Sequence, residues 1–297
     1  MTRMERRHMR NGLLFASPYI VGFMIFILYP LGASLYYSFC QYNVIMPPAW
    51  VGLQNFHELF FQDPLFWKAL YNTLYFAVFS VPLALAFSLS LALLLNQKLR
   101  GMAVYRTLFF LPSIVPIVAS SVLWLWVLNP ESGLINGMLR QFLGMEGPGW
   151  IADEHWAKPS LVIMSLWAVG GAMVIFLAGL ADVPQTLYEV ADIDGAGRWA
   201  KFRHVTLPML TPTILFNLIM GLIGAFQYFT QVYVMTGGKG GPIDSTMFYA
   251  LYLYRNSFYY LRMGYASAMA WLLFLVILAA TLTLLATSKR WVHYHGE

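Results

Sequence analysis

Charged residues are scarce in this chain. Of its 297 residues only 10% are Asp, Glu, Lys or Arg, whereas 59% are hydrophobic. A soluble globular domain carries about 25% charged residues, and intrinsic disorder requires low hydrophobicity. The composition therefore excludes a water-soluble enzyme of ordinary build and disfavours a disordered chain.

Cysteine and the common catalytic motifs are also missing. Cys40 is the single cysteine, which excludes an intrachain disulfide framework and any metal site built from several cysteines. The sequence has no HExxH motif and no nucleophile elbow. Its nearest approach to a phosphate-binding loop is Gly238-Lys239, but the next residue is Gly rather than Ser or Thr. We therefore expect no enzymatic activity, no cofactor and no metal.

Six long stretches contain no Asp, Glu, Lys, Arg or His at all. They cover residues 14–39, 70–95, 107–128, 160–181, 209–236 and 264–287. Each is longer than the ~20 apolar residues that a helix needs to cross the hydrocarbon core of a bilayer. The sequence therefore predicts an all-α integral membrane protein with six transmembrane helices, and we expect residues 1–297 to form a single transmembrane domain in a lipid bilayer.

The 18 Lys and Arg residues are divided unevenly between the two sides of these stretches. If the N-terminus is cytoplasmic, six are external and the other twelve are internal; the external ones are Lys68, Arg140, Lys158, Lys239, Arg255 and Arg262. Basic residues accumulate in the cytoplasmic loops of membrane proteins, so both termini are predicted to be cytoplasmic. This sorting explains the net charge of +5 without a nucleic-acid partner.

The absence of ionisable residues from the predicted spans also limits the mechanism. Proton-coupled transporters and pumps use intramembrane carboxylates or histidines as relays. The chain therefore has no evident means of coupling transport to a proton gradient. Sodium coupling through backbone carbonyls stays open.

The fifth stretch carries a cluster of uncharged polar side chains. In a continuous helix Gln227, Tyr228 and Gln231 would share one face, at positions i, i+1 and i+4. Their amides and phenol suit a neutral polyhydroxylated solute, whereas hydrogen bonding between helices, about 0.6 kcal/mol each, is the structural alternative. We consider these three residues for the substrate pathway, with Trp167 in the fourth stretch as a weaker candidate.

The internal segment 182–208 predicts two short helices joined by a turn. Asp182, followed by a proline in the first turn, is a typical helix start, and Gly195 is a typical C-terminal cap. A second helix is expected over 198–206 and should end at Pro208. Such a pair of helices could rest at the lipid boundary or insert its small-residue turn into a groove of a cytoplasmic partner.

This segment resembles the EAA loop in the membrane subunits of ATP-binding-cassette importers. The matching pattern is Glu189-Val190-Ala191, three residues, Gly195, nine residues, and then Val205-Thr206-Leu207-Pro208. Val190 is a departure, because the family usually has Ala there. Further likeness, at 17–18, 29–30, 51–56, 106–112 and 236–238, is to the branch that imports sugars and glycerol-phosphate-like solutes, with the larger maltose-transporter membrane subunit as the most similar type.

The resemblance implies a type I ABC importer permease fold and a division of labour. Two such permease subunits would form the pathway, a dimer of cytoplasmic ATPases would supply the power, and an external solute-binding protein would deliver the sugar. The chain would then be a multi-pass permease subunit in a bacterial or archaeal plasma (inner) membrane. By resemblance, coupling to the ATPase would fall to Glu189, Ala191, Asp192, Asp194, Gly195 and Ala196.

A sugar or oligosaccharide is the expected solute, and two alternatives stay open. One is a permease of the same build for a glycerol-phosphate-type solute, although a phosphate calls for Arg, Lys or helix N-termini. The other is an integral-membrane enzyme that acts on lipid-linked sugars. Activity without any ATPase partner would favour that enzyme.

Overall fold

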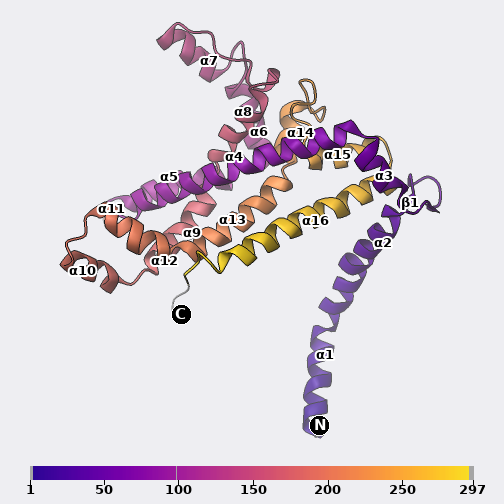
Figure 1. The fold of residues 1–297 in the computed structure, drawn as a ribbon, viewed down its shortest axis with the longest axis horizontal. Helices are drawn as coiled ribbons and strands as arrows, with labels where there is room; N and C mark the ends of the chain where they lie inside the picture. Colours follow the sequence, from indigo (N-terminus) through magenta and orange to yellow (C-terminus); the bar gives the residue numbers. More distant parts are fainter. Residues whose placement is uncertain (1–2, 98, 294–297) are drawn as a thin grey trace. The chain divides into compact units, whose positions relative to one another are not determined.

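Helices dominate the chain, and its internal contacts divide into two compact units. The computed structural model describes residues 3–97 and 99–293 (Figure 1). One unit comprises Met1–Asp63 and Leu253–Phe274, and the other comprises Pro64–Tyr252 and Leu275–Glu297. Lys98, one of the twelve basic residues predicted to be internal, lies outside the described residues.

The first unit begins with a long, almost wholly exposed helical run. It consists of α1 (Arg3–Phe23), a π-helical turn (Met24–Leu28) and α2 (Tyr29–Ser38). The π turn lies directly before Pro30, whose ring would collide with the carbonyl of Phe26 in a regular α-helix. The extra residue in the turn lets the helix continue past the proline.

A short connection follows and is held by the side chain of one asparagine. Strand β1 (Cys40–Gln41) pairs antiparallel with β2 (Ala49–Trp50), and α3 (Gln54–Phe61) comes next. The amide nitrogen of buried Asn55 donates to the carbonyls of Ser38 and Cys40, at 2.8 and 2.9 Å. Asn55 therefore fastens the start of α3 to the end of α2, which gives the 51–56 segment a structural role.

The second unit is organised around α4 (Pro64–Leu95). This helix packs against α8 (Ala157–Leu166), α9 (Gly170–Ala181) and α13 (Thr211–Phe226). Its remaining helices are α5 (Met102–Ile114), α6 (Ile117–Val127), α7 (Leu134–Met138), α10 (Gln185–Ile193), α11 (Arg198–Lys201), α12 (Leu207–Met209) and α14 (Thr230–Thr236). Helices α15 (Tyr249–Tyr254) and α16 (Met263–Ser288) contribute residues to both units. A buried apolar cluster joins α4 to α9, with Leu91, Ala92, Met173 and Phe176 at its centre.

Four helical segments of the described chain are long and apolar enough to cross a membrane, and up to six if each of two bent pairs counts as one span. The four are Met4–Ser38, Pro64–Leu95, Thr211–Thr236 and Met263–Ser288. A multi-pass helical membrane protein is therefore confirmed, while the count of six spans and the cytoplasmic position of both termini stay predictions.

The third and fourth predicted stretches are not straight helices. Helices α5 and α6 meet at 96°, and α8 and α9 meet at 45°. At the first bend Val115 is extended, with ψ 130°, because the ring of Pro116 disfavours the helical conformation in the preceding residue. Each of the predicted spans 107–128 and 160–181 is thus a pair of bent helices, and whether each pair crosses the membrane as one span stays a prediction.

Some of the glycines in these helices allow close packing, whereas Gly171 does not have that role. A Cβ atom on Gly170 would lie 2.8 Å from the Phe109 carbonyl oxygen and 2.9 Å from the Cα of Phe110. A Cβ atom on Gly171 would meet nothing within 4 Å. Helix α9 therefore rests directly on the backbone of α5 at Gly170. In α13, a Cβ atom on Gly221 would lie 3.2 Å from a side-chain methyl group of Val81 in α4, which is a tight contact with a side chain rather than with the backbone.

Replacing Gly170 with Val should separate α5 from α9 and lower the stability of the protein by about 1–3 kcal/mol. The matched control is Gly171→Val, which adds the same side chain one residue later, where there is room. The midpoint of thermal unfolding of the purified protein should fall more for Gly170→Val. Equal midpoints for the two variants would contradict the close packing.

Candidate substrate pathway and coupling loop

The fifth predicted stretch is interrupted where its polar cluster lies. Helix α13 ends at Phe226, residues 227–229 are not helical, and α14 begins at Thr230. The assumption that Gln227, Tyr228 and Gln231 share one face of a continuous helix was therefore wrong. The backbone turns at Gln227, so the three side chains leave the break in different environments: Gln227 is exposed, Tyr228 is buried and Gln231 is half-buried.

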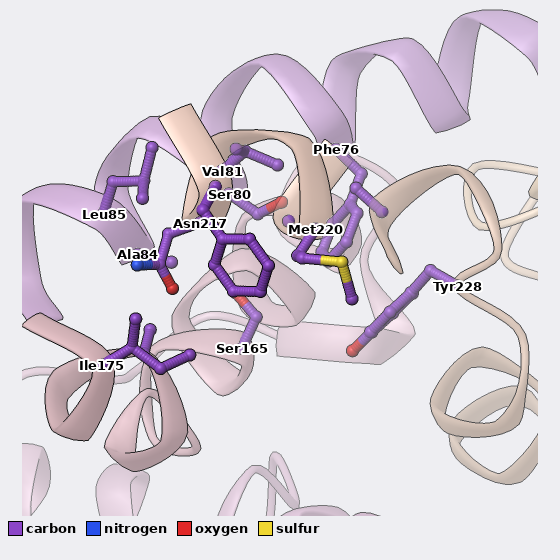
Figure 2. A pocket seen from close by; sticks show the side chains of 14 residues that line it. Phe76, Ser80, Val81, Ala84, Leu85, Ser165, Ile175, Asn217, Met220 and Tyr228 are labelled. Carbon is purple, nitrogen blue, oxygen red and sulfur yellow. The ribbon is translucent and has the colours of Figure 1, made fainter. Parts of the chain in front are cut away.

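A cavity of about 440 Å³ lies beside this break, between α4, α13 and the α8–α9 pair. Most of its lining is apolar, and four residues bring polar groups to it: Ser80, Ser165, Asn217 and Tyr228. Figure 2 shows these side chains around the cavity, with the ring of Tyr228 at one end. The mixture of an apolar wall and a few polar groups is typical of small-molecule sites.

Tyr228 is fixed by stacking and has an unused hydroxyl. Its ring lies 4.2 Å from that of Phe76, centroid to centroid, and 5.9 Å from that of Phe248. The residue is only 8% exposed, and its hydroxyl oxygen has no hydrogen-bond partner among the described residues. Buried polar groups are normally paired, so this hydroxyl is available to a molecule in the cavity.

Asn217 presents a second polar group. Its amide nitrogen donates to the carbonyl of Thr213, one turn earlier in α13, at 2.9 Å. This bond uses one of the two N–H donors of the amide, and the side-chain oxygen is the atom that can accept from a solute hydroxyl. Phe76, Ser80 and Asn217 were not selected from the sequence, because nothing along the chain indicates that α4 and α13 would face each other at these positions.

The other pathway candidates lie outside this lining. Neither Gln227 nor Gln231 contributes to the cavity, and their roles stay predictions. Trp167 follows the end of α8 and lines a neighbouring cavity of about 460 Å³, where its ring meets that of Trp124 edge to face at 6.3 Å.

The internal segment forms the expected helix–turn–helix. Helix α10 covers Gln185–Ile193, and Gly195 follows with φ +72° in the left-handed region. The amide of Ala196 donates to the carbonyl of Ala191 at 2.8 Å, and that of Gly195 donates to Asp192 at 3.1 Å. These are the two bonds of a Schellman motif, which ends a helix at a left-handed residue. Gly195 is thus the residue that permits the turn.

Two side-chain contacts hold the two arms of this loop together. Tyr188 in α10 and Thr206 share a hydrogen bond of 2.9 Å between their hydroxyls. Lys201 in α11 forms a close ion pair with Asp192 of α10. The loop is therefore a braced pair of helices, and its second arm leads through α12 into α13.

Two details of the loop differ from the expectation. Asp182 makes no side-chain cap, because α10 begins after Pro184, and Asp182 instead ends α9. Pro208 does not end the second arm, which continues through a π turn (Phe202–Thr206) into α12. The wider turn contains His204, whose carbonyl the proline ring would otherwise strike.

The loop exposes apolar side chains beside charged ones. Ile193 is 86% exposed and Trp199 is 71% exposed, and Val190 is exposed next to Glu189 on α10. The carboxylates of Asp192 and Asp194 are exposed as well. A mixed face of this kind is typical of a protein interface. In the described part of the chain, no group of three or more His, Cys, Asp or Glu residues could hold a metal ion.

Comparison with known families gives a match over residues 84–293, to the family described as the binding-protein-dependent transport system inner membrane component. The chain belongs to this family. It is a membrane permease subunit of an importer, and ATP hydrolysis is carried out by separate ATPase subunits. Members of the family work with a second permease, an ATPase and a solute-binding protein.

Individual relatives extend over nearly the whole permease. The probable ABC transporter permease protein YesP of Bacillus subtilis is 43% identical over 298 residues, which covers 100% of this chain and 96% of the relative. The lactose transport system permease protein LacF of Rhizobium radiobacter is 36% identical, with 92% of each chain covered. A chain of a bacterial alginate ABC transporter, crystallised with an alginate pentasaccharide-bound periplasmic protein, superposes with a TM-score of 0.83 at 25% identity, over 97% of this chain and 98% of its own. The type I importer permease fold is thereby confirmed.

Replacing Tyr228 with Phe tests the unused hydroxyl. Because that group is buried and no described residue is its hydrogen-bond partner, its removal should leave the stability of the permease unchanged or raise it by up to about 1 kcal/mol. Solute uptake by the assembled importer should nevertheless fall, since the solute loses a hydrogen bond. Thermal unfolding and uptake kinetics measure the two effects.

Tyr105→Phe, on an exposed tyrosine of α5 away from the cavity lining, is the matched control and should change neither quantity. Gln227→Ala gives a second comparison, and a loss of uptake there would extend the pathway to the break between α13 and α14. Normal uptake by Tyr228→Phe would mean that this tyrosine contributes only to packing and does not bind the solute.

Proposed function

We propose that this chain forms half of the translocation pathway for a sugar or oligosaccharide in an ATP-driven importer of a bacterial or archaeal inner membrane. In this proposal residues 1–297 act as one transmembrane domain with six spans and both termini in the cytoplasm. The assignment of a sugar as the solute depends on the similarity, over more than nine-tenths of the chain, to permeases named for lactose and alginate transport.

The lining of the cavity favours a solute that binds through its hydroxyl groups. Its polar groups are the neutral side chains Ser80, Ser165, Asn217 and Tyr228, and it contains no charged residue. Neutral donors and acceptors pair with sugar hydroxyls without the desolvation of a charge. The stacked rings of Phe76 and Tyr228 offer an apolar wall, which suits the less polar face of a sugar ring.

The braced loop supports coupling to the ATPase. We assign the contact with the ATPase to Glu189, Ala191, Asp192, Asp194, Gly195 and Ala196, which lie on α10 and its terminal turn. A helix held by the Tyr188–Thr206 and Asp192–Lys201 contacts moves as a rigid element. Closure of the ATPase dimer would then displace the helices of the permease as a body and switch the side to which the cavity opens.

Glu189→Lys should abolish uptake while leaving the protein abundant in the membrane. The carboxylate is exposed in the isolated chain, where replacement changes stability by at most about 0.5 kcal/mol. At an interface, loss of one member of a buried charge pair costs about 2–5 kcal/mol, and the reversed charge adds repulsion. The measurement is co-purification of the ATPase, together with substrate-stimulated ATP hydrolysis in the reconstituted complex. Gln185→Lys, one turn earlier on the same helix, serves as the control.

Gly195→Val should have a similar effect through the backbone. A Cβ atom there has free space, so the cost comes from the left-handed conformation alone. Gly197→Val is a matched control, because Gly197 has an extended backbone and equal space. If both Glu189→Lys and Gly195→Val show wild-type uptake and ATP hydrolysis, the loop does not couple to the ATPase and only lies at the lipid surface.

Uptake of labelled sugars by the reconstituted importer tests the solute class, guided by mass spectrometry of the ligand that its solute-binding protein retains. The expected result is a sugar or oligosaccharide whose transport depends on ATP and on the binding protein. Transport activity without an ATPase, or a retained ligand that is not a saccharide, would contradict the proposal.

A further inference from the structure

Two lysines at the external ends of α4 and α8 have no carboxylate partner in the part of the chain that the structure describes. Lys68 donates to the carbonyl of Ile243 at 2.6 Å, and Lys158 donates to the side-chain oxygen of Asn72 at 3.1 Å. Among the described residues, neither ammonium group has a carboxylate within 4.0 Å. These hydrogen bonds of the two ammonium groups are therefore to neutral acceptors.

The surroundings of Lys158 disfavour the charged form of its side chain. The side chain is half-buried between α8 and α4, and its ammonium lies 5.1 Å from the ring centre of Tyr71 and 5.3 Å from that of Tyr75. Burial lowers the pKa of Lys158, the charge of Lys68 lowers it further, and the more distant Glu154 partly opposes the shift. Lys158 is also the second residue of α8, where the helix dipole disfavours a cation. A bound anion would relieve each of these effects.

The position of the two lysines matches the edge of the membrane. Lys68 and Lys158 each lie two residues before a charge-free stretch, 70–95 and 160–181 respectively. Trp67 and Tyr71, on the same turns of α4, are 50% and 59% exposed. Exposed Trp and Tyr residues gather at the level of the lipid headgroups, which is the level of the lipid phosphates.

We propose that Lys158, supported by Lys68, binds a phosphate group at the external ends of α4 and α8. The ammonium groups supply charge-assisted hydrogen bonds. Asn72 keeps Lys158 in place, because its own amide nitrogen is anchored to the carbonyls of Asp244 and Met247 at 2.9 and 3.0 Å. The phosphate can come from an anionic lipid headgroup or from free phosphate, and the aromatic side chains around the site favour the lipid. This site is distinct from the cavity between α4 and α13, since neither lysine lines that cavity.

The test uses the whole importer, with both permeases and the ATPase, and two lipid probes. Native mass spectrometry compares the retention of palmitoyl-oleoyl phosphatidylglycerol, which is anionic, with that of the phosphatidylcholine of the same chains. One basic residue near an anionic membrane surface changes affinity by about fivefold. The wild-type complex should therefore retain phosphatidylglycerol about fivefold more strongly, and Lys158→Gln, which keeps a hydrogen-bond donor without the charge, should remove the preference.

Lys239→Gln, at another external lysine, is the matched control and should keep the preference. Lys68→Gln gives a second variant, with a smaller loss expected, so the outcome does not depend on the folding of one protein. The second arm adds inorganic phosphate to complexes in phosphatidylcholine nanodiscs and follows thermal unfolding. If inorganic phosphate stabilises the wild-type complex but not Lys158→Gln, and the wild-type complex shows no lipid preference, the site is supported and its ligand is free phosphate.

Two results would overturn the proposal. One is equal retention of both lipids by the wild-type complex together with no effect of inorganic phosphate. The other is that Lys158→Gln lowers the stability of the complex by the same amount whether or not the lipid or the phosphate is present. Lys158 would then serve only to join α8 to α4. Sugar uptake is measured separately, so neither result bears on the proposed transport function.

Discussion

Inside the hydrocarbon of a bilayer, every backbone amide and carbonyl must find its partner within the protein. This constraint explains why a chain with so few charges is built from helices, and why departures from regular helix are informative. The π turns before Pro30 and Pro208 keep the helices continuous where a proline would otherwise break them. The bends at Pro116 and after Trp167, and the gap at 227–229, leave backbone groups that only the surrounding structure can satisfy.

The break after α13 coincides with the cavity that we propose as part of the solute pathway. The cavity lies where α13 ends and beside the α8–α9 pair, because a break in a helix opens space that straight packing would close. Tyr228 lies in the break itself, where its ring stacks on that of Phe76 and its hydroxyl has no hydrogen-bond partner within the described ranges. The packed helices thus present to the cavity a tyrosine hydroxyl that the folded chain does not need for its own hydrogen bonds.

The loop after α9 is held in shape by contacts within itself. Its turn depends on Gly195, and its arms are joined by one hydrogen bond and one ion pair. Neither contact alone contributes much to stability. Together they brace the two helices of the loop against each other, as the proposed coupling role requires.

The sequence by itself determined the class of the protein and the local structure of its loop. Long charge-free stretches require membrane helices whatever their neighbours are, and the Schellman turn at Gly195 depends on residues within one turn of it. The lining of the cavity was decided by the tertiary structure. The helical face predicted for Gln227, Tyr228 and Gln231 disappeared because α13 stops at Phe226, while Phe76, Ser80 and Asn217 meet only after α4 and α13 have packed. Periodicity along one helix describes a single surface, whereas a cavity is the space that several surfaces leave between them.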